Sequence, residues 1–562
     1  MTRIPVRFLD TDLGAACRLS EVERLSEFVR DEDSEVLKLF HPDQKNHCST
    51  GDWYGEHAGK WLAAAGLTYW SNNSEDLRAQ IEQVVSYLGV QQEESGYLGT
   101  YAKDSNSRMT NECAENARTW DIWIHSWLLL GLLEVVDIPG CGQSETITKR
   151  IGELVLLEFG SGRRPVDQGN HAGLSSLVII EPLALMAKKW DDSRYSDLAL
   201  AFFNQAVDSG LDFWGATDVS QIGTGKSYQL LWCLKGLLEL GQVLDREDLV
   251  GIVAKHWANV RDFHLTPMGG PWGGIATHKE VFNPPDFFDP CGLVETCSSV
   301  TWMMLSHRLF EVTGDSSYLA EVEKTLFNSV LGAIDENGKD WCYFTFPNGR
   351  RNNTYHWACC KSSGALGLAY AASAVVAEKD GICSILSLES CEFETPDGAS
   401  VRVIVGADSV SIMSSGTLNL AIYVSPSFEM VDVPEEAVRE GDWLCFGVLP
   451  DVLTEIGIKR KFQVELKTHF VDHHGQEIVR EEYVCVKLGR DVFATGKFEG
   501  YRTQETLRMP RLAPESVFKV IGESEVELRQ AGRDPILMVP YWRCGGRHEG
   551  AWRTTWLQVA WQ

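Results

Sequence analysis

Residues 293–334 read LVETCSSVTWMMLSHRLFEVTGDSSYLAEVEKTLFNSVLGAI, and this stretch decides the fold. Its first part, 294–313, is an apolar, helix-like segment. In its second part, apolar side chains recur at helical spacing, at Tyr318, Val322, Leu326 and Val330. The stretch therefore predicts two consecutive helices.

The same helical pattern continues on both sides of this stretch. One clear stripe consists of Leu77, Ile81, Val84 and Leu88, and a capping box at Ser20 and Glu23 predicts the beginning of the first helix. Counting such segments gives about twelve helices between residues 20 and 377. Twelve helices predict an (α/α)6 barrel, a helical toroid in which inner and outer helices alternate.

Beyond Asp380 the pattern changes to alternation with a period of two. Val401, Val403 and Val405 form one such run, and turn sequences such as PDG at 396–398 interrupt the runs. This pattern predicts an antiparallel β-sandwich of about 180 residues. We therefore expect a multidomain α+β protein, with an (α/α)6-barrel catalytic domain at 1–380 and a β-sandwich domain at 381–562.

The barrel would present a concave end built from loops, which is a place that ligand pockets favour. Aromatic residues at or near predicted helix ends fit such a cleft and suggest a carbohydrate or another flat organic ligand. The alternative is that most of them belong to the core. These aromatic residues are Trp53, Tyr54, Tyr97, Tyr101, Trp120, Trp123, Trp127, Trp272 and Phe287.

Composition excludes several kinds of partner. The 562 residues include 51 Lys and Arg against 79 Asp and Glu, a net charge of −28. Nucleic acids and anionic membranes require a basic surface, so neither is expected as a partner. The charge says nothing specific about the substrate, and a small-molecule or glycoside substrate remains open. The first thirty residues contain no apolar signal region, and no apolar run is long enough to span a membrane, which predicts a cytoplasmic protein. The fifteen cysteines then fit free thiols better than disulfides.

Two short motifs could carry metal chemistry: Glu295-Thr296-Cys297 and Cys359-Cys360. Three cysteines and one carboxylate form a suitable tetrahedral set for zinc. In a regular helix, Glu295 and Cys297 would point to opposite sides, so the two could converge only at a loop or at a helix start. From spacing alone, a pair of buried thiols and a chance E-x-C triplet are the alternative reading.

The stretch 293–334 resembles the β-L-arabinofuranosidase family, glycoside hydrolase family 127 and its relatives. The similarity lies in the ETC start, the TGD turn and the L-x-N centre of the second helix. Four further segments are similar to that family: GKWLAAAGLTYW and ESGYLGTY near the beginning, GGPWGGIATHKEVF at 269–282, and VPYWRCGGRHEGAWRTTWLQVAW at the end. The resemblance thus spans most of the chain.

This resemblance implies an α/α barrel followed by β-sandwich modules, and a zinc ion held by Glu295, Cys297, Cys359 and Cys360. It implies that Cys359 is the nucleophile and that Glu280 is the acid/base. A thiolate that attacks an anomeric carbon would form a thioglycosyl intermediate, and Glu280 would protonate the leaving oxygen and later deprotonate water. The expected activity is that of a zinc-dependent retaining glycoside hydrolase acting on a small furanoside or an uncommon sugar.

The sequence departs from the family at several positions. WACCKSS replaces a C-S-C-C-P-P-N run, so Trp357 stands beside the predicted nucleophile and could fill part of the sugar pocket. Lys226 stands where a substrate-binding histidine is expected, and a second such histidine has no clear counterpart near Ser176. The predicted substrate-binding residues are His125, Lys226, His278 and Trp357.

These departures leave two alternatives open. In the first, the protein is an enzyme of specialised metabolism that reuses the pocket for a non-hydrolytic cyclisation, elimination or isomerisation. In the second, it is a non-catalytic scaffold with a structural zinc, because a closed site with four protein ligands is typical of structural zinc.

Overall fold

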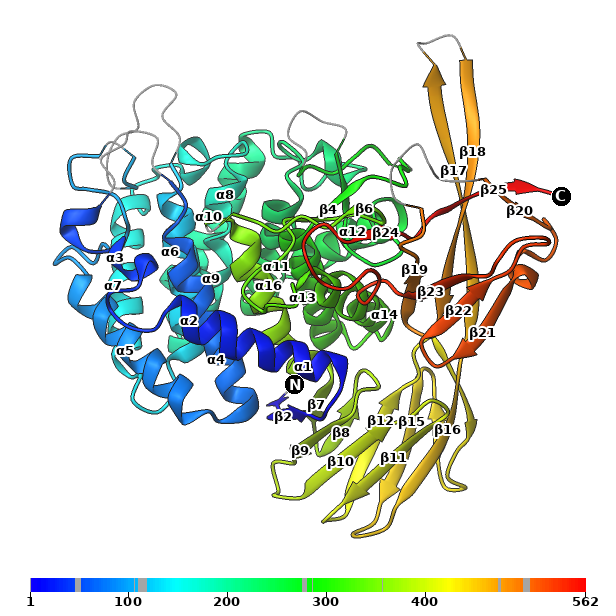
Figure 1. The fold of residues 1–562 in the computed structure, drawn as a ribbon. Coiled ribbons are helices and arrows are strands. Elements are labelled where there is room, and N and C mark those ends of the chain that lie inside the picture. The colour runs from blue at the N-terminus through cyan, green and yellow to red at the C-terminus, as the bar shows by residue number, and fades with distance from the viewer. Residues whose placement is uncertain are drawn as a thin grey trace.

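The structure is a computed structural model. It describes residues 2–45, 52–105, 107–109, 119–274, 280–285, 287–355, 357–473, 477–498 and 506–562. A ring of helices occupies the N-terminal two thirds of the chain, and β-sheets follow it (Figure 1). The predicted α+β architecture, a helical barrel followed by antiparallel β-structure, is confirmed.

Six helices form the inner wall of the barrel. Contacts run from each of them to the next and return from the last to the first, which closes the ring. Most of their residues are buried on every side, as expected for helices enclosed by others. In ring order they are α4 (Glu56–Asn72), α6 (Asp121–Val135), α9 (Ile180–Trp190), α11 (Ser227–Val243), α13 (Thr296–Thr313) and α16 (Cys359–Ala369).

The outer helices cover this ring and are amphipathic. In α5 the predicted stripe of Leu77, Ile81, Val84 and Leu88 is buried. The main outer helices are α5 (Glu75–Gln91), α7 (Gln143–Phe159), α10 (Ser193–Asp208), α12 (Glu247–Phe263) and α14 (Ser317–Lys324), with the π-helical η5 (Thr325–Val330) and α15 (Leu331–Ala333). Shorter helices are α3 (Glu35–Lys38) and α8 (Leu174–Leu177). None of the helices in the described part of the chain is long and apolar enough to cross a bilayer.

The first helix begins earlier than the capping box predicted, and that prediction is wrong. Helix α1 (Asp12–Leu19) is capped by Thr11, whose hydroxyl accepts a hydrogen bond from the Gly14 amide at 3.1 Å. Ser20 continues this helix as the first residue of the π-helical η1 (Ser20–Leu25), which leads into α2 (Ser26–Phe28). The S-x-x-E pattern therefore lies inside a helix.

Helices α4 and α6 approach each other closely through two glycines. A Cβ atom at Gly59 would overlap the Trp127 carbonyl, and one at Gly131 would overlap the Gly59 carbonyl. Because backbone atoms cannot move aside as a flexible side chain can, we expect Gly59→Ala to lower the free energy of unfolding by about 3 kcal/mol. Chemical denaturation measures this change.

A matched glycine lies on the outer ring. A Cβ atom at Gly251 in α12 would meet no atom within 4 Å. Gly251→Ala is therefore expected to raise the free energy of unfolding by about 0.5 to 1 kcal/mol, through helix propensity alone. Equal effects of the two substitutions would contradict the close approach of α4 and α6.

Two sheets, in which all strand pairs but one are antiparallel, form a sandwich around one hydrophobic core. The first contains, in order, β1 (Thr2–Arg3), β7 (Val376–Lys379), β8 (Ile382–Ile385), β12 (Leu418–Tyr423), β15 (Trp443–Val448) and β14 (Val438–Glu440). The second contains β13 (Phe428–Asp432), β16 (Thr454–Arg460), β11 (Ser409–Ser414), β10 (Ser400–Val405), β9 (Cys391–Glu394) and β2 (Val6–Phe8). Strands from before the barrel thus complete both sheets.

A further sheet with its own core follows the sandwich in sequence. Its order is β20 (Leu507–Met509), β25 (Leu557–Trp561), β18 (Glu477–Leu488), β19 (Asp491–Ala494), β23 (Ile536–Pro540), β22 (Glu525–Leu528) and β21 (Phe518–Gly522), and β17 (Phe462–His473) pairs with β18. Strand β24 (Trp552–Thr554) pairs with β6 (Asn348–Arg350) of the helical part. This pairing fixes the last β unit against the barrel.

Candidate active site and metal centre

The two cysteine motifs lie at the beginnings of adjacent inner helices. Glu295 is the last residue of β4 (Leu293–Glu295) and the N-cap of α13, so it stands outside the helix. Cys297 lies in the first turn of α13, and Cys359 and Cys360 are the first two residues of α16. The helix start that the E-x-C spacing requires is therefore present.

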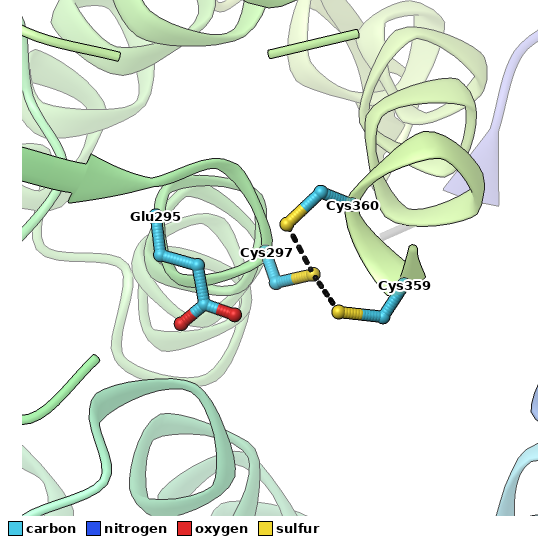
Figure 2. Close-up of side chains that lie close together, drawn as sticks. All are labelled: Glu295, Cys297, Cys359 and Cys360. Carbon is cyan, nitrogen blue, oxygen red and sulfur yellow. Dashed lines mark hydrogen bonds between the residues drawn. The ribbon is translucent and has the colours of Figure 1, made fainter. Parts of the chain in front are cut away.

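The four side chains converge (Figure 2). The Sγ atom of Cys297 lies 3.2 Å from that of Cys360 and 3.5 Å from that of Cys359. One ligand atom from each of these residues and from Glu295 lies within 4.8 Å of all the others. Three sulfurs and one carboxylate oxygen at such separations are a donor set that suits zinc.

Only one of the two carboxylate oxygens of Glu295 accepts hydrogen bonds. Its Oε2 atom accepts hydrogen bonds from Lys226 Nζ at 2.9 Å and from Ser298 Oγ at 3.0 Å. Its Oε1 atom is buried and has no hydrogen-bond partner. Burial raises the pKa of Glu295 to about 8, against the opposing effect of Lys226. A buried oxygen without a partner beside three thiols fits a metal ligand.

The three thiols differ in their electrostatics. The thiols of Cys297 and Cys360 hydrogen-bond to Cys359 and hold its pKa well below the usual range, and the ammonium groups of Lys60 and Lys226 act in the same direction. Burial raises the pKa of Cys297 and of Cys360 well above the usual range. Cys359 is thus the thiol that ionises first, and the thiolate is the nucleophilic form of cysteine.

The cluster opens into a cavity of about 240 Å³ at the end of the barrel where the inner helices begin. Cys359 is the only cysteine among the described residues that line it. Its aromatic lining residues are Trp53, Trp120, Trp123, Tyr228, Tyr343 and Tyr355, and its polar ones are Glu56, His171, Lys226, Gln229, Glu280, Glu295 and Cys359.

Lys226 joins the two glutamates that the sequence singled out. Its ammonium group forms ion pairs with Glu280 and with Glu295 and is almost completely buried. The backbone supports this arrangement, because the Ser227 amide donates a hydrogen bond to the Glu280 carbonyl at 3.1 Å. Glu280 therefore lies in the cavity, next to the cluster and on the Lys226 side.

The other predicted substrate-binding residues lie in different surroundings. His125 is buried in α6; its Nδ1 lies 2.8 Å from the Asp121 carbonyl, and its Nε2 accepts from the Leu98 amide at 3.3 Å. Trp357 stacks on Tyr54 with ring centroids 4.9 Å apart. His278 lies outside the described residues.

Of the aromatic residues predicted at the cleft, Trp53, Trp120 and Trp123 line the cavity, whereas Tyr97, Tyr101 and Trp127 are core residues. The sequence did not single out His171, which lines the cavity in contact with Trp120. Its backbone is left-handed, with φ of 57°, in a turn before α8. Ser176, near which a helical histidine was expected, lies five residues further along the chain in α8.

The helical part of the chain matches a known family. Residues 14–373 match the family profile described as β-L-arabinofuranosidase, GH127 catalytic domain. A non-reducing end β-L-arabinofuranosidase of Bifidobacterium longum subsp. longum is 20% identical over 374 residues, which are 58% of this chain and 56% of that protein. The chain thus spans little more than half the length of this curated relative.

Solved structures give the same overall shape. The GH127 β-L-arabinofuranosidase of Geobacillus stearothermophilus T6 superposes with a TM-score of 0.74 at 16% identity, over 99% of this chain and 100% of that one. A second GH127 β-arabinofuranosidase gives a TM-score of 0.73 at 16% identity, over 99% and 98%. At such low identity, this likeness concerns the fold.

Proposed function

The chain belongs to the β-L-arabinofuranosidase family, glycoside hydrolase family 127, and from this premise we propose that it is a zinc-dependent retaining glycoside hydrolase with a cysteine nucleophile. Its substrate would be a small β-L-arabinofuranoside-like glycoside. The observation that carries the proposal is the convergence of Glu295, Cys297, Cys359 and Cys360 at a cavity that Glu280 also lines.

The zinc ligands would be those four residues. The donor set fits the ion, and the free Oε1 atom of Glu295 offers the carboxylate ligand while Lys226 and Ser298 hold Oε2. A bound zinc ion keeps coordinating thiols ionised. The two well-buried thiols, Cys297 and Cys360, would anchor the site, and the partly exposed Cys359 would remain within reach of a substrate.

In the first step, the Cys359 sulfur attacks the anomeric carbon and forms a carbon–sulfur bond as the bond to the leaving oxygen breaks. Glu280 donates its proton to that oxygen. In the second step, Glu280 takes a proton from water, the water oxygen attacks the anomeric carbon, and the carbon–sulfur bond breaks. Two inversions give overall retention, with sulfur in place of the usual carboxylate.

Lys226 would orient the acid/base in this scheme. Its ammonium group bridges Glu280 and Glu295, so it fixes the acid/base relative to the metal ligand. Because the ammonium group already pairs with both carboxylates, an orienting role for Lys226 is favoured over direct recognition of the sugar. The substrate contacts proposed for His125, His278 and Trp357 remain proposals.

Hydrolysis of 4-nitrophenyl β-L-arabinofuranoside, followed by NMR, tests the reaction. We expect the β-anomer of arabinose to appear first and the α-anomer to follow by mutarotation. The α-anomer as first product would contradict the retaining scheme. A purified protein without turnover of any aryl furanoside would contradict the proposed function and favour a non-hydrolytic use of the cavity.

Metal analysis tests the centre independently of turnover. We expect about one zinc per purified chain and a loss of at least about 100-fold in zinc affinity for Cys297→Ala, because removal of a direct ligand should cost at least as much as removal of its outer partners. Cys233→Ala is the matched control, since Cys233 is also a buried thiol of an inner helix but lies against the Leu174 carbonyl. Equal zinc content in all three proteins would rule out this ligand set.

A further inference from the structure

A second charged pair lies in the wall of the cavity, and its carboxylate has no part in the scheme above. Glu56, at the beginning of α4, lines the cavity and is 1% exposed. Its Oε2 atom accepts a hydrogen bond from the indole of Trp123, and its Oε1 atom lies 3.1 Å from the ammonium group of Lys60, one turn further along α4. Both partners are buried.

Lys60 is held in place by aromatic rings. Its Nζ atom lies 4.8 Å from the ring centroid of Trp127 and 5.1 Å from that of Tyr228, which come from α6 and α11. Such cation–π contacts stabilise an ammonium group that has left water. The lysine is thereby fixed beneath Glu56 and can hold the carboxylate at one place in the wall.

Stability does not account for this pair. A buried ion pair costs free energy to desolvate, and apolar residues of similar size are often equally stable or more so. The Oε1 atom of Glu56 accepts no hydrogen bond of good geometry, although a carboxylate has about four acceptor positions. Burial also raises the pKa of Glu56 to about 7. A costly carboxylate with spare acceptor positions in a cavity wall is characteristic of a binding site.

The position of the pair in the ring defines what it can contact. Helices α4 and α11 are three steps apart in the closed ring of six, so Glu56 faces the Lys226 side of the cavity across its width. Glu280 lies on that opposite side, and Cys359 lies between the two on α16. The anomeric centre would lie near Cys359 and Glu280, which leaves Glu56 for a hydroxyl elsewhere on the sugar.

We infer that Glu56 is a substrate-binding residue that accepts a hydrogen bond from one hydroxyl of the sugar ring, and that Lys60 is the positioning residue that holds it. This inference rests on the proposed function, because it takes a furanoside as the ligand. It adds a recognition element on α4 to the catalytic residues on the other side of the cavity.

Removing single hydroxyls from the substrate tests the inference. The substrates are 4-nitrophenyl β-L-arabinofuranoside and its 2-deoxy, 3-deoxy and 5-deoxy analogues. For Glu56→Gln we expect kcat/KM on the parent substrate to fall by about 10- to 100-fold, the range of a charged hydrogen bond. On one of the three analogues, the same substitution should cost less than about 3-fold, because the hydroxyl that it contacts is already missing.

Lys60→Met removes an ammonium group that also favours the Cys359 thiolate, so it should lower kcat/KM on all four substrates. The loss should be smallest on the analogue that lacks the hydroxyl bound by Glu56. The control is Glu181→Gln, which also breaks a buried ion pair, in this case between α9 and α11 through Lys235, at the other mouth of the ring. It should leave kcat/KM on the parent substrate within about 3-fold of the unsubstituted protein. Thermal melting of each variant reports its folding.

Three results would overturn the inference. One is an equal loss for Glu56→Gln on all four substrates. Another is no loss on any of them. The third needs no variant: if the unsubstituted protein hydrolyses all three deoxy analogues as well as the parent, no hydroxyl is recognised. A protein that hydrolyses none of the four substrates would instead overturn the proposed function itself, and this inference with it.

Discussion

Replacing Cys359 by alanine is expected to lower kcat/KM for 4-nitrophenyl β-L-arabinofuranoside by on the order of 10⁴- to 10⁶-fold, as removal of a covalent nucleophile does elsewhere. The reason lies in its position and its electrostatics. Among the cysteines of the described chain, Cys359 alone lines the cavity, and neighbouring thiols and ammonium groups favour its thiolate. Alanine leaves no atom that could bond the anomeric carbon.

A loss of activity could also arise from a loss of metal, so a direct readout of the covalent bond is needed. Acid quenching during turnover, followed by mass spectrometry of the peptides, should find one pentosyl group on the peptide that carries Cys359 and Cys360. A Cys360→Ala protein that still binds zinc should form this pentosyl adduct, whereas Cys359→Ala should not form the adduct. Turnover that survives in Cys359→Ala would disprove the assigned mechanism.

Replacing Glu280 by glutamine should have the second largest effect. General acid and base catalysis contributes about 10²- to 10⁴-fold, and we expect a loss of that size on a substrate with a poor leaving group. On the 4-nitrophenyl substrate, departure of the leaving group needs little protonation, so bond cleavage should be nearly normal while the second step is slow. A burst of nitrophenol followed by slow turnover is the expected signature.

Azide provides the internal control for this variant. Because azide is a nucleophile that needs no base, it should accelerate turnover of Glu280→Gln and form a β-glycosyl azide. Glu336→Gln serves as the matched substitution, since Glu336 does not line the cavity. If Glu280→Gln kept full activity on every substrate, Glu280 would have no catalytic role, as the scaffold hypothesis requires.

The convergence of Glu295 with the three cysteines could be predicted from the family resemblance, whereas spacing alone left two buried thiols and a chance E-x-C triplet as the alternative. Glu295 and Cys297 are two residues apart, and a helix start between them is the arrangement that allows both to face one point. Glu295 is indeed the N-cap of α13. The cavity was harder to predict. Glu56 and Lys60 have the i, i+4 spacing of an ordinary surface ion pair, and only closure of the ring by distant helices buries them.

His171 could not be found by periodicity. It stands in a turn with a left-handed backbone, where no repeating pattern leads to it. The sheets posed a related problem, because alternation identifies strands but not their partners. Strands β1 and β2 are two and three residues long, too short for a recognisable period, and only pairing with β7 and β9 reveals them.

These two early strands impose an order on biosynthesis. Val6 pairs with Phe393, so the whole barrel must be translated before the neighbour of β2 exists. At about 5 to 20 residues per second, the interval is roughly 20 to 80 s. Throughout it, the ribosome-bound chain carries two unpaired strand edges. The sandwich therefore forms late, because both of its sheets can be completed only after the barrel has been translated.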